Sequence, residues 1–250
     1  MSAALLPPPI TAPAGVDAAL RERGHAVLDA AGLHTLLGAA DGALGAWPAY
    51  WHRLPPDEHL RDGGRYRSRR HGSFVVDGPQ VGAAPHRAHW QPVEYNALHG
   101  GFERWFEPLE TELVAEPLWP RLLVMFAERA SALRGAQPWF VEAHPFRIDT
   151  ADGIGRPTPE GAHRDGVDLV AVLLVAREGV KGGETRVFDA EGPTGLRFTM
   201  SRPWTTLLLD DARVIHETTP IQPDDAKQRG CRDTLVITLR AGGFQGPALD

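Results

Sequence analysis

The sequence predicts a mainly β fold with flanking helices, arranged as an antiparallel sandwich or barrel. The second half of the 250-residue chain contains short runs rich in β-branched residues, and Gly, Pro and Asp turns separate them. No helical pattern interrupts these runs, whereas the first half shows helical periodicity. A composition with 42% hydrophobic and 23% charged residues is ordinary for a globular protein.

The N-terminal half is predicted to be largely helical. Residues 1–15 are rich in proline, which disfavours a helix, so we expect a flexible arm there. A helix is expected over 17–39, where apolar residues recur on one face; Asp17 is its expected N-cap, and Gly24 or Gly32 is expected to break it.

Between 61 and 96 the chain is irregular, with short strands expected around 66–76. Two further helices are expected over 101–115 and 120–134, because proline at positions 117 and 120 marks a break between them. The strands predicted after them span 139–148, 168–176, 184–188, 205–210, 214–219 and 233–240. We expect one domain over 16–250, with a helical part at about 16–135 and a β core at about 139–241.

Charge and composition exclude several classes of protein. The net charge of −6 argues against nucleic acid as a partner. No stretch approaches the ~20 apolar residues of a membrane span, and the N-terminus lacks the pattern of a signal peptide. The single cysteine, Cys231, excludes an intrachain disulfide and a cysteine-based metal site. A cytoplasmic protein is therefore expected, with neither a nucleic-acid nor a membrane partner.

The segment PTPEGAHRDG (157–166) carries the most informative chemistry. If the backbone is extended, His163 and Asp165 point to the same face. His216 lies in a later apolar strand, after a tight turn. Two imidazoles and one carboxylate make the facial triad that leaves positions open on a non-haem Fe(II) ion. By itself the His-x-Asp pair is weak evidence, since chance alone predicts about one in a chain of this composition.

Arg232 stands at the head of the last predicted strand. Arg232 and Thr234 share one face of that strand, which places a cation inside a β core. A buried guanidinium is costly unless it is paired, and its planar fork suits a carboxylate. The two residues are therefore candidates to hold a carboxylate, Arg232 by a bidentate pair and Thr234 by a further hydrogen bond.

These residues resemble the motif of the iron(II)/2-oxoglutarate-dependent dioxygenases. More specifically, the chain is similar to the bacterial family that includes the L-isoleucine dioxygenases, which hydroxylate free L-amino acids. The similarity covers about 60–240, in the stretches RYRSRRHGSF (65–74), EYNALHGGFERWFEPL (94–109), HPFRI (144–148), PTPEGAHRDGVDLVAVLLVAREGVKGGET (157–185), TLLLDDARVIHETTPI (206–221) and GCRDTLVITL (230–239).

The resemblance implies a double-stranded β-helix, or jelly roll, of the cupin-like type. It assigns His163, Asp165 and His216 to Fe(II) and places Arg232 on the distal carboxylate of 2-oxoglutarate, with O₂ as the third reactant. The implied reaction hydroxylates an unactivated C–H bond of a free L-amino acid or close analogue and releases succinate and CO₂. The carboxylate at Asp165 favours hydroxylation, because halogenating relatives carry a small residue there.

A free amino acid needs partners for its carboxylate and its ammonium group. Polar residues around the motif supply the candidates, namely Arg65, Tyr66, Arg67, Gln91, Asn96, His144 and Arg147. Other histidines are weaker candidates for metal ligands because no carboxylate follows two residues on, namely His86, His89, His99 and His144.

Three rival functions stay open at this point. The substrate is alternatively a residue in a peptide or on a carrier. A non-catalytic cupin-like binding protein would not need to keep the triad and the arginine together. A zinc hydrolase would use a metal-bound water and would not need a carboxylate anchor such as Arg232. The sequence does not determine the oligomeric state.

Overall fold

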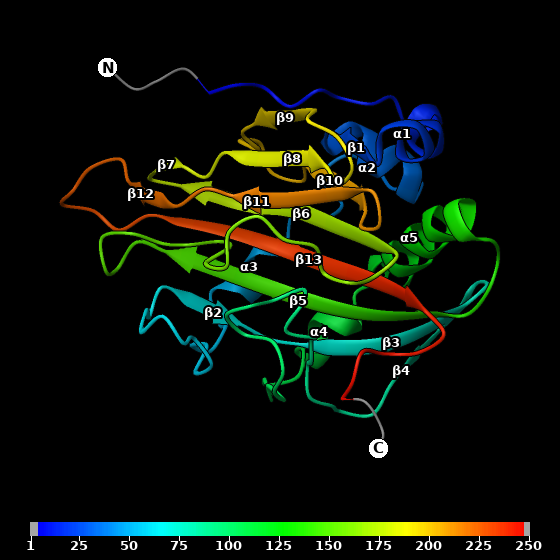
Figure 1. Ribbon diagram of the computed structural model, residues 1–250, viewed down its shortest axis with the longest axis horizontal. Coiled ribbons are helices and arrows are strands. Elements are labelled where there is room, and N and C mark those ends of the chain that lie inside the picture. The colour runs from blue at the N-terminus through cyan, green and yellow to red at the C-terminus, as the bar shows by residue number, and fades with distance from the viewer. Residues whose placement is uncertain (1–4, 248–250) are drawn as a thin grey trace.

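Most strands lie in two antiparallel sheets, and a separate two-stranded sheet completes the β core, as the computed structural model shows for residues 5–247 (Figure 1). The larger sheet has the order β1-β10-β6-β13-β5-β3-β4, with β2 also paired to β5; the smaller sheet is β11-β8-β9, and β12 pairs with β7. The strands are β1 (His25–Leu28), β2 (Arg67–Arg69), β3 (Gly72–Asp77), β4 (Gln80–Ala83), β5 (Trp139–Asp149), β6 (Leu169–Glu178), β7 (Val180–Gly182), β8 (Thr185–Asp189), β9 (Gly195–Phe198), β10 (Thr206–Asp210), β11 (Val214–Thr218), β12 (Ile221–Pro223) and β13 (Cys231–Ala241). The predicted mainly β jelly-roll core is confirmed.

β6 shows why the central strands read as continuous apolar runs. It lies in the middle of the larger sheet, between β10 and β13. Ala171, Leu173 and Val175 pack into the core on the helical side, while Val170 and Leu174 pack against residues of the smaller sheet. Because both faces are covered, apolar side chains are favoured at every position.

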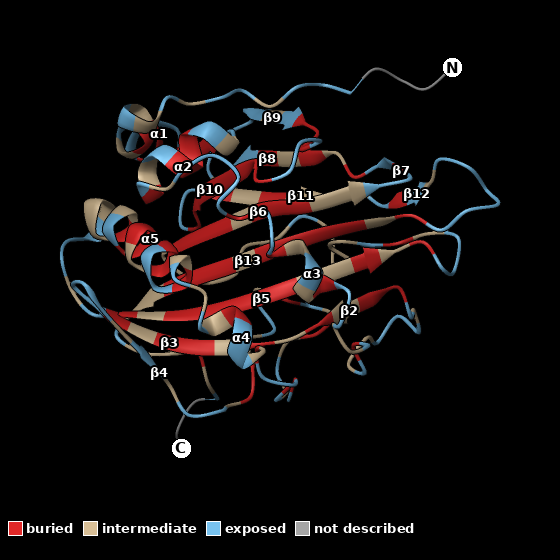
Figure 2. Ribbon diagram, turned by 180° about the vertical axis from the view of Figure 1, so that it is seen from behind, coloured by how far each residue is buried: buried red, intermediate tan, exposed pale blue. Residues whose placement is uncertain are grey.

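The helices cover the outer face of the larger sheet (Figure 2). They are α1 (Val16–Arg23), α2 (Ala30–Leu37), α3 (Pro48–Trp51), α4 (Thr111–Val114) and α5 (Leu118–Arg134), with a 3₁₀ turn η1 (Pro13–Gly15) before α1. α5 buries Leu122, Phe126 and Ala130, which recur at helical spacing, so the helix predicted over 120–134 is confirmed. No helix within the described residues is long and apolar enough to cross a lipid bilayer.

The helix predicted over 17–39 breaks at Gly24, one of the two expected positions, but the helical assignment is wrong over 25–28. A strand, β1, separates α1 from α2 and pairs with β10 in the core. α1 ends at Gly24, which has a φ of +73° that suits glycine. Asp17 lies in the first turn of α1 rather than at its N-cap; the carboxylate that caps a helix is Asp29, which accepts the Gly32 N–H at 2.8 Å. Pairing with β10 outweighs the local helical periodicity.

The helix predicted over 101–115 is also wrong, since only α4 within it is helical. Residues 101–110 are irregular, and Arg104 exchanges two backbone hydrogen bonds with His89, at 2.9 and 3.0 Å. This pairing with a distant segment replaces the local bonds of a helix. The segment around 66–76 forms β2 and β3 as expected, and every strand predicted after residue 138 is present.

The Pro-rich segment has no regular secondary structure from residue 5 to 12. It makes backbone hydrogen bonds to the rest of the chain, from Thr11 N–H to Val27 (2.7 Å) and from Thr199 N–H to Leu6 (2.8 Å). Residues 1–4 of the predicted arm lie outside the described residues. The division of the chain into an arm and one domain stays a prediction.

Candidate active site and metal centre

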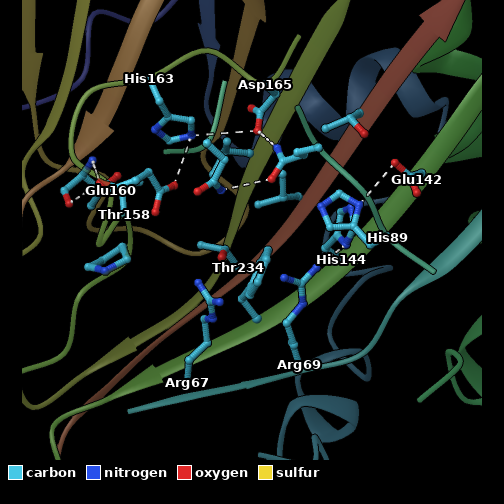
Figure 3. Close-up of a pocket in the computed structure, with 18 of the residues that line it drawn as sticks. Arg67, Arg69, His89, Glu142, His144, Thr158, Glu160, His163, Asp165 and Thr234 are labelled. Carbon is cyan, nitrogen blue, oxygen red and sulfur yellow. Dashed lines mark hydrogen bonds and ion pairs between the residues drawn. The ribbon is translucent and has the colours of Figure 1, made fainter. Parts of the chain in front are cut away.

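A pocket lies over the inner face of the larger sheet, and polar side chains dominate the view into it (Figure 3). β5 and β13 are neighbours in that sheet and present alternate side chains to the pocket. The other walls come from residues 89–104, 157–167 and β11. Segments far apart in the sequence therefore meet at one site.

His163, Asp165 and His216, which we name the first ligand group, converge at this pocket. The two histidines exchange backbone hydrogen bonds of 3.0 and 2.9 Å, so the fold fixes them side by side. The Nε2 atom of His163 lies 3.8 Å from Oδ1 of Asp165, and Nε2 of His216 lies 3.8 Å from Oδ2. The three side chains offer ligand atoms within 4.8 Å of one another, which is close enough to share one ion.

The two imidazoles are prepared for metal binding in different ways. The Nδ1 atom of His163 lies 2.9 Å from the carbonyl oxygen of Gly161, which can only accept, so Nδ1 carries the hydrogen and Nε2 presents its lone pair. Burial lowers the pKa of His216 well below its ordinary value, which keeps the imidazole neutral. Burial also lowers the pKa of His163, but Asp165 and Glu160 raise it more, so that it lies above its ordinary value.

Asp165 is held from several sides. The carboxylate of Asp211 accepts the backbone N–H groups of residues 165–167, at 3.0, 2.7 and 3.1 Å. Gln91 donates its amide N–H to Oδ1 of Asp165 at 3.1 Å, and Gln245 donates to the Asp165 carbonyl at 3.0 Å. Burial and the charge of Asp165 raise the pKa of Asp211 to about 7. The site is therefore rich in negative charge, which a cation would stabilise.

Arg232 and Thr234 both line the pocket from β13. The Arg232 side chain is buried, and its Nε atom has no hydrogen-bond partner within residues 5–247. Burial lowers its pKa to about 10, so it stays a cation at neutral pH. A buried cation with an unused donor fits the distal carboxylate of a bound diacid.

Four of the predicted substrate residues line the pocket, namely Arg67, Gln91, Asn96 and His144. Gln91 accepts hydrogen bonds from Asn96 (3.1 Å) and Arg104 (2.9 Å) while donating to Asp165, so its amide orientation is fixed. Arg67 pairs with the buried carboxylate of Asp57 at 2.6 Å. Gln91 and Arg67 therefore belong to the pocket wall: the amide of Gln91 is occupied by hydrogen bonds to protein groups, and the charge of Arg67 is balanced by Asp57.

The other three predicted substrate residues do not line the pocket. The side chain of Arg65 is 88% exposed. Tyr66 precedes Arg67 and donates its hydroxyl to Asp62 at 2.5 Å, away from the pocket. Arg147 binds Asp233 through two hydrogen bonds of 2.8 and 2.6 Å. Arg147 points away from the pocket because side chains alternate along a strand and both of its neighbours in β5 face the pocket.

A second ligand group consists of His71, His89, Glu142 and His144, and all of them except His71 line the same pocket. Its ligand atoms also lie within 4.8 Å of one another, and all four residues are buried. By residue type and distance it fits an iron ion as the first ligand group does. Several of its atoms already have partners, however: Glu142 accepts from His71 (2.9 Å) and Arg87 (3.0 Å), and Arg69 lies 2.6 Å from Nδ1 of His144. Within residues 5–247, Nδ1 of His71 and Nδ1 of His89 have no hydrogen-bond partner.

Sequence reasoning missed several pocket residues. Glu142 is one of them; it alternates with the predicted His144 in a largely apolar strand, a pattern that could have marked a polar face. Glu160 precedes His163 by three residues, and its Oε1 lies 3.5 Å from Nε2 of that histidine. Arg104 had no usable signal, because the non-local pairing with His89 puts it in the wall.

The chain resembles solved structures over nearly its whole length. A bsmA homolog from Methylobium petroleophilum PM1 is 55% identical with a TM-score of 0.91, and the match covers 96% of this chain and 97% of that one. IDO from Bacillus thuringiensis has a TM-score of 0.74 at 15% identity, covering 93% and 97% of the two chains. The Fe(II)/α-ketoglutarate-dependent dioxygenase TqaL has a TM-score of 0.71 at 19% identity, covering 94% and 90%. The last two likenesses show the fold alone.

Among curated proteins, none is similar enough to this chain to count as a relative. The family model for 2OG-Fe dioxygenases matches residues 48–238, which include both ligand groups and Arg232. A match over this much of the chain settles its family. The chain belongs to the 2OG-Fe dioxygenases, whose reaction uses Fe(II), 2-oxoglutarate and O₂.

Proposed function

We propose that the first ligand group holds the Fe(II) ion of this dioxygenase. The single observation that carries the proposal is that the three ligands line the same pocket as Arg232, whose buried Nε has no hydrogen-bond partner within residues 5–247. Two imidazoles and one carboxylate leave metal positions open for a chelating cosubstrate and for O₂. The second ligand group is disfavoured as the iron site, because Arg69 and Arg87 already add positive charge to it.

We assign Arg232, with Thr234 beside it on β13, to the distal carboxylate of 2-oxoglutarate. The guanidinium would neutralise that carboxylate and orient the diacid with its other end toward the first ligand group. When bound, Fe(II) would activate O₂, which is the oxidant: one oxygen atom would enter succinate as 2-oxoglutarate loses CO₂, and the other would enter a C–H bond of the substrate. The polypeptide positions the reactants and keeps water from the buried charges.

The substrate is proposed to be a free L-amino acid or a close analogue. Support comes from the wall of the pocket, which carries unpaired cationic donors as well as the Glu160 carboxylate, and from the sequence resemblance to amino acid hydroxylases. Arg67, Asn96 and His144 stay candidates for contacts to it. Two alternatives stay open: hydroxylation of a residue in a peptide or on a carrier, and a non-catalytic binding role.

Anaerobic reconstitution tests the assignment. The purified protein receives Fe(II) and then 2-oxoglutarate, and the visible absorption of the chelate is recorded, followed by succinate release on admission of air. The wild type should form the chelate, Arg232→Met should raise the 2-oxoglutarate concentration needed, and Arg197→Met, an exposed arginine on β9, should behave as wild type. Absence of both the absorption and succinate in the wild type would contradict the proposal.

The substrate is then sought among free amino acids, peptides and carrier-bound residues, with mass spectrometry for a product heavier by one oxygen atom. Oxygen insertion into a free amino acid supports the proposal. Insertion only into peptides or carrier-bound residues would overturn the substrate class while leaving the iron and 2-oxoglutarate assignments intact.

A further inference from the structure

Two of the arginines that line the pocket already have a partner: Arg67 has a carboxylate of the protein, and Arg232 is assigned to the cosubstrate. Arg67 is paired with Asp57 at 2.6 Å, and the Asp57 side chain is fully buried. Arg232 is assigned to 2-oxoglutarate. On the anionic side, Glu142 is paired with Arg87 at 3.0 Å. Neither pair requires a substrate carboxylate; Nη2 of Arg67 is buried without a partner within residues 5–247, so Arg67 stays a candidate for a polar contact to the substrate.

Arg69 and Arg104 remain, and neither forms an ion pair with a carboxylate within residues 5–247. Each donates one hydrogen bond to a neutral group: Arg69 Nη2 lies 2.6 Å from Nδ1 of His144, and Arg104 Nη2 lies 2.9 Å from Oε1 of Gln91. In each guanidinium the Nε atom is buried without a partner. Their side chains are almost wholly buried, with exposed fractions of 3% and 2% for the residues.

The surroundings of these two arginines favour a bound anion over water. Arg69 lies between two aromatic rings, 3.9 Å from the centroid of Phe106 and 4.3 Å from that of Phe146, which hold the guanidinium in place. Gln91 holds Arg104 from one side, and the same amide donates to Asp165 of the first ligand group. Buried cations with unused donors are stabilised when a carboxylate supplies the missing acceptors.

The position of the pair separates it from the cosubstrate. Across the sheet, Arg67 on β2 and Arg232 on β13 are both level with Ile148, whereas Arg69 and Thr234 are level with Phe146. Arg69 is therefore level with Thr234, the second residue assigned to 2-oxoglutarate, but it lies on β2, with β5 between the two strands. Figure 3 shows its guanidinium near His144, on the side of the pocket away from Glu160 and Thr158. An anion at this position would be additional to 2-oxoglutarate.

We propose that Arg69 and Arg104 form a subsite for a free carboxylate of the substrate. The inference rests on the proposed function and narrows it: the enzyme takes a free acid, and a residue inside a peptide or held as a carrier thioester lacks the group that the subsite binds. Arg65, Tyr66 and Arg147 have no part in the subsite, since they lie outside the pocket.

Ligand binding to the wild type gives a test that needs no variant. Each of the twenty L-amino acids is added to the protein loaded with Mn(II) and 2-oxoglutarate under anaerobic conditions, and to metal-free protein, and binding is followed by thermal shift. The best ligand is then compared with its own primary amide, which has the same side chain and ammonium group but no carboxylate. The acid should bind about 10- to 100-fold more tightly, the range for loss of a charged hydrogen bond.

Two variants locate the effect. Arg69→Met and Arg104→Met should each remove most of the preference for the acid over the amide, while Arg197→Met on exposed β9 should keep it. Methionine retains the apolar part of the side chain, so the packing on Phe106 and Phe146 is largely preserved. Binding of 2-oxoglutarate to the metal-loaded variants should remain within about twofold of wild type, which would confirm that each variant is folded.

Equal binding of the acid and the amide by the wild type would overturn the subsite, as would an unchanged preference in both variants. Hydroxylation of carrier-bound residues with no binding of free acids would overturn it too. If iron and 2-oxoglutarate fail to bind, the proposed function fails, and the acid-to-amide comparison on metal-free protein still decides whether the carboxylate subsite exists.

Discussion

The two ligand groups of the pocket contain the same types of side chain and differ in what surrounds them. Around the first, Asp165 and Glu160 place two carboxylates beside the histidines, and no arginine within residues 5–247 pairs with either one. Around the second, Glu142 faces Arg87 and the ring of His144 faces Arg69. A divalent cation would lower the electrostatic energy of the first group and raise that of the second.

The hydrogen bonds lead to the same conclusion. His163 keeps Nε2 free because its Nδ1–H is used by a carbonyl. In the second group the lone pair of His144 is already used by Arg69, since Nδ1 must be the acceptor there. A set of residues at ligand distances therefore becomes a metal site or a buried polar support according to whether its lone pairs and charges have been used by neighbours.

The largest expected effect is loss of the metal. The wild type should bind one Fe(II) per chain, His216→Ala should bind none with measurable affinity, and its activity should fall below detection because one of three ligands is gone. His71→Phe removes a member of the second ligand group that lies outside the metal pocket, and it should retain one Fe(II). Equilibrium dialysis with metal analysis measures both, and the reverse pattern would exchange the two assignments.

Neutralising the carboxylate of each group should change the stability of metal-free protein in different ways. Glu142→Gln leaves Arg87 and the histidines around a neutral amide and should lower the free energy of unfolding by about 3–5 kcal/mol, as loss of one partner of a buried pair does. Asp165→Asn removes a charge that is repelled by Asp211, so the free energy of unfolding should stay within about 1 kcal/mol or rise. Urea unfolding without metal measures both values. Equal losses would show that the two carboxylates play the same structural role.

Acid should destabilise the protein through the second ligand group. Burial lowers the pKa of His89 to about 3 and also lowers those of His71 and His144, so these rings are neutral when folded and take up protons on unfolding. Their contribution is complete above the unfolded pKa of about 6.5 and falls as the pH drops toward the folded values, by up to about 1.4 kcal/mol per pH unit for each ring.

Protonation of Glu142 removes further stability. Burial raises the pKa of its carboxyl, but the neighbouring histidines lower it more. The stability that the carboxylate contributes is therefore lost as the pH falls below the ordinary pKa of a glutamate. Arg69 and Arg87 face the same cluster, and their charges lower the pKa of His71 further. Unfolding free energies of wild type and His89→Phe, measured from pH 7 to 4.5, isolate the contribution of one ring. Parallel curves for the two proteins would show that His89 is not held neutral by the fold.

The β core and the candidate first ligand group could be predicted from the sequence. β6, β10 and β13 are covered on both faces and read as apolar runs, while Arg232 and Thr234 interrupt such a run on one face. β1 was read as helix because its four residues continue a helical pattern, and only its pairing with β10 decides otherwise.

His89 and His144 were named as weaker metal-ligand candidates, but the second ligand group could not be predicted as a group, because its residues come from three separate segments and their partners from still others. The same holds for the subsite arginines. The sequence showed a cluster of arginines between 65 and 70, but it could not show that Asp57 neutralises Arg67 while Arg69 has no carboxylate. Which cation is free depends on tertiary ion pairs.

The smallest effect concerns Gln91, which connects the substrate side of the pocket to the first ligand group. Arg104 and Asn96 both donate to its Oε1, so its N–H can only face Asp165. Gln91→Leu keeps a similar volume but removes the bond that orients the carboxylate, and it should weaken Fe(II) binding by about 10- to 100-fold. Asn96→Ala removes only one of the two donors that orient Gln91 and should weaken Fe(II) binding less. Competition with a chelator of known affinity measures both constants, and an unchanged constant in a folded Gln91→Leu would mean that Asp211 and Gln245 orient Asp165 without help from the pocket wall.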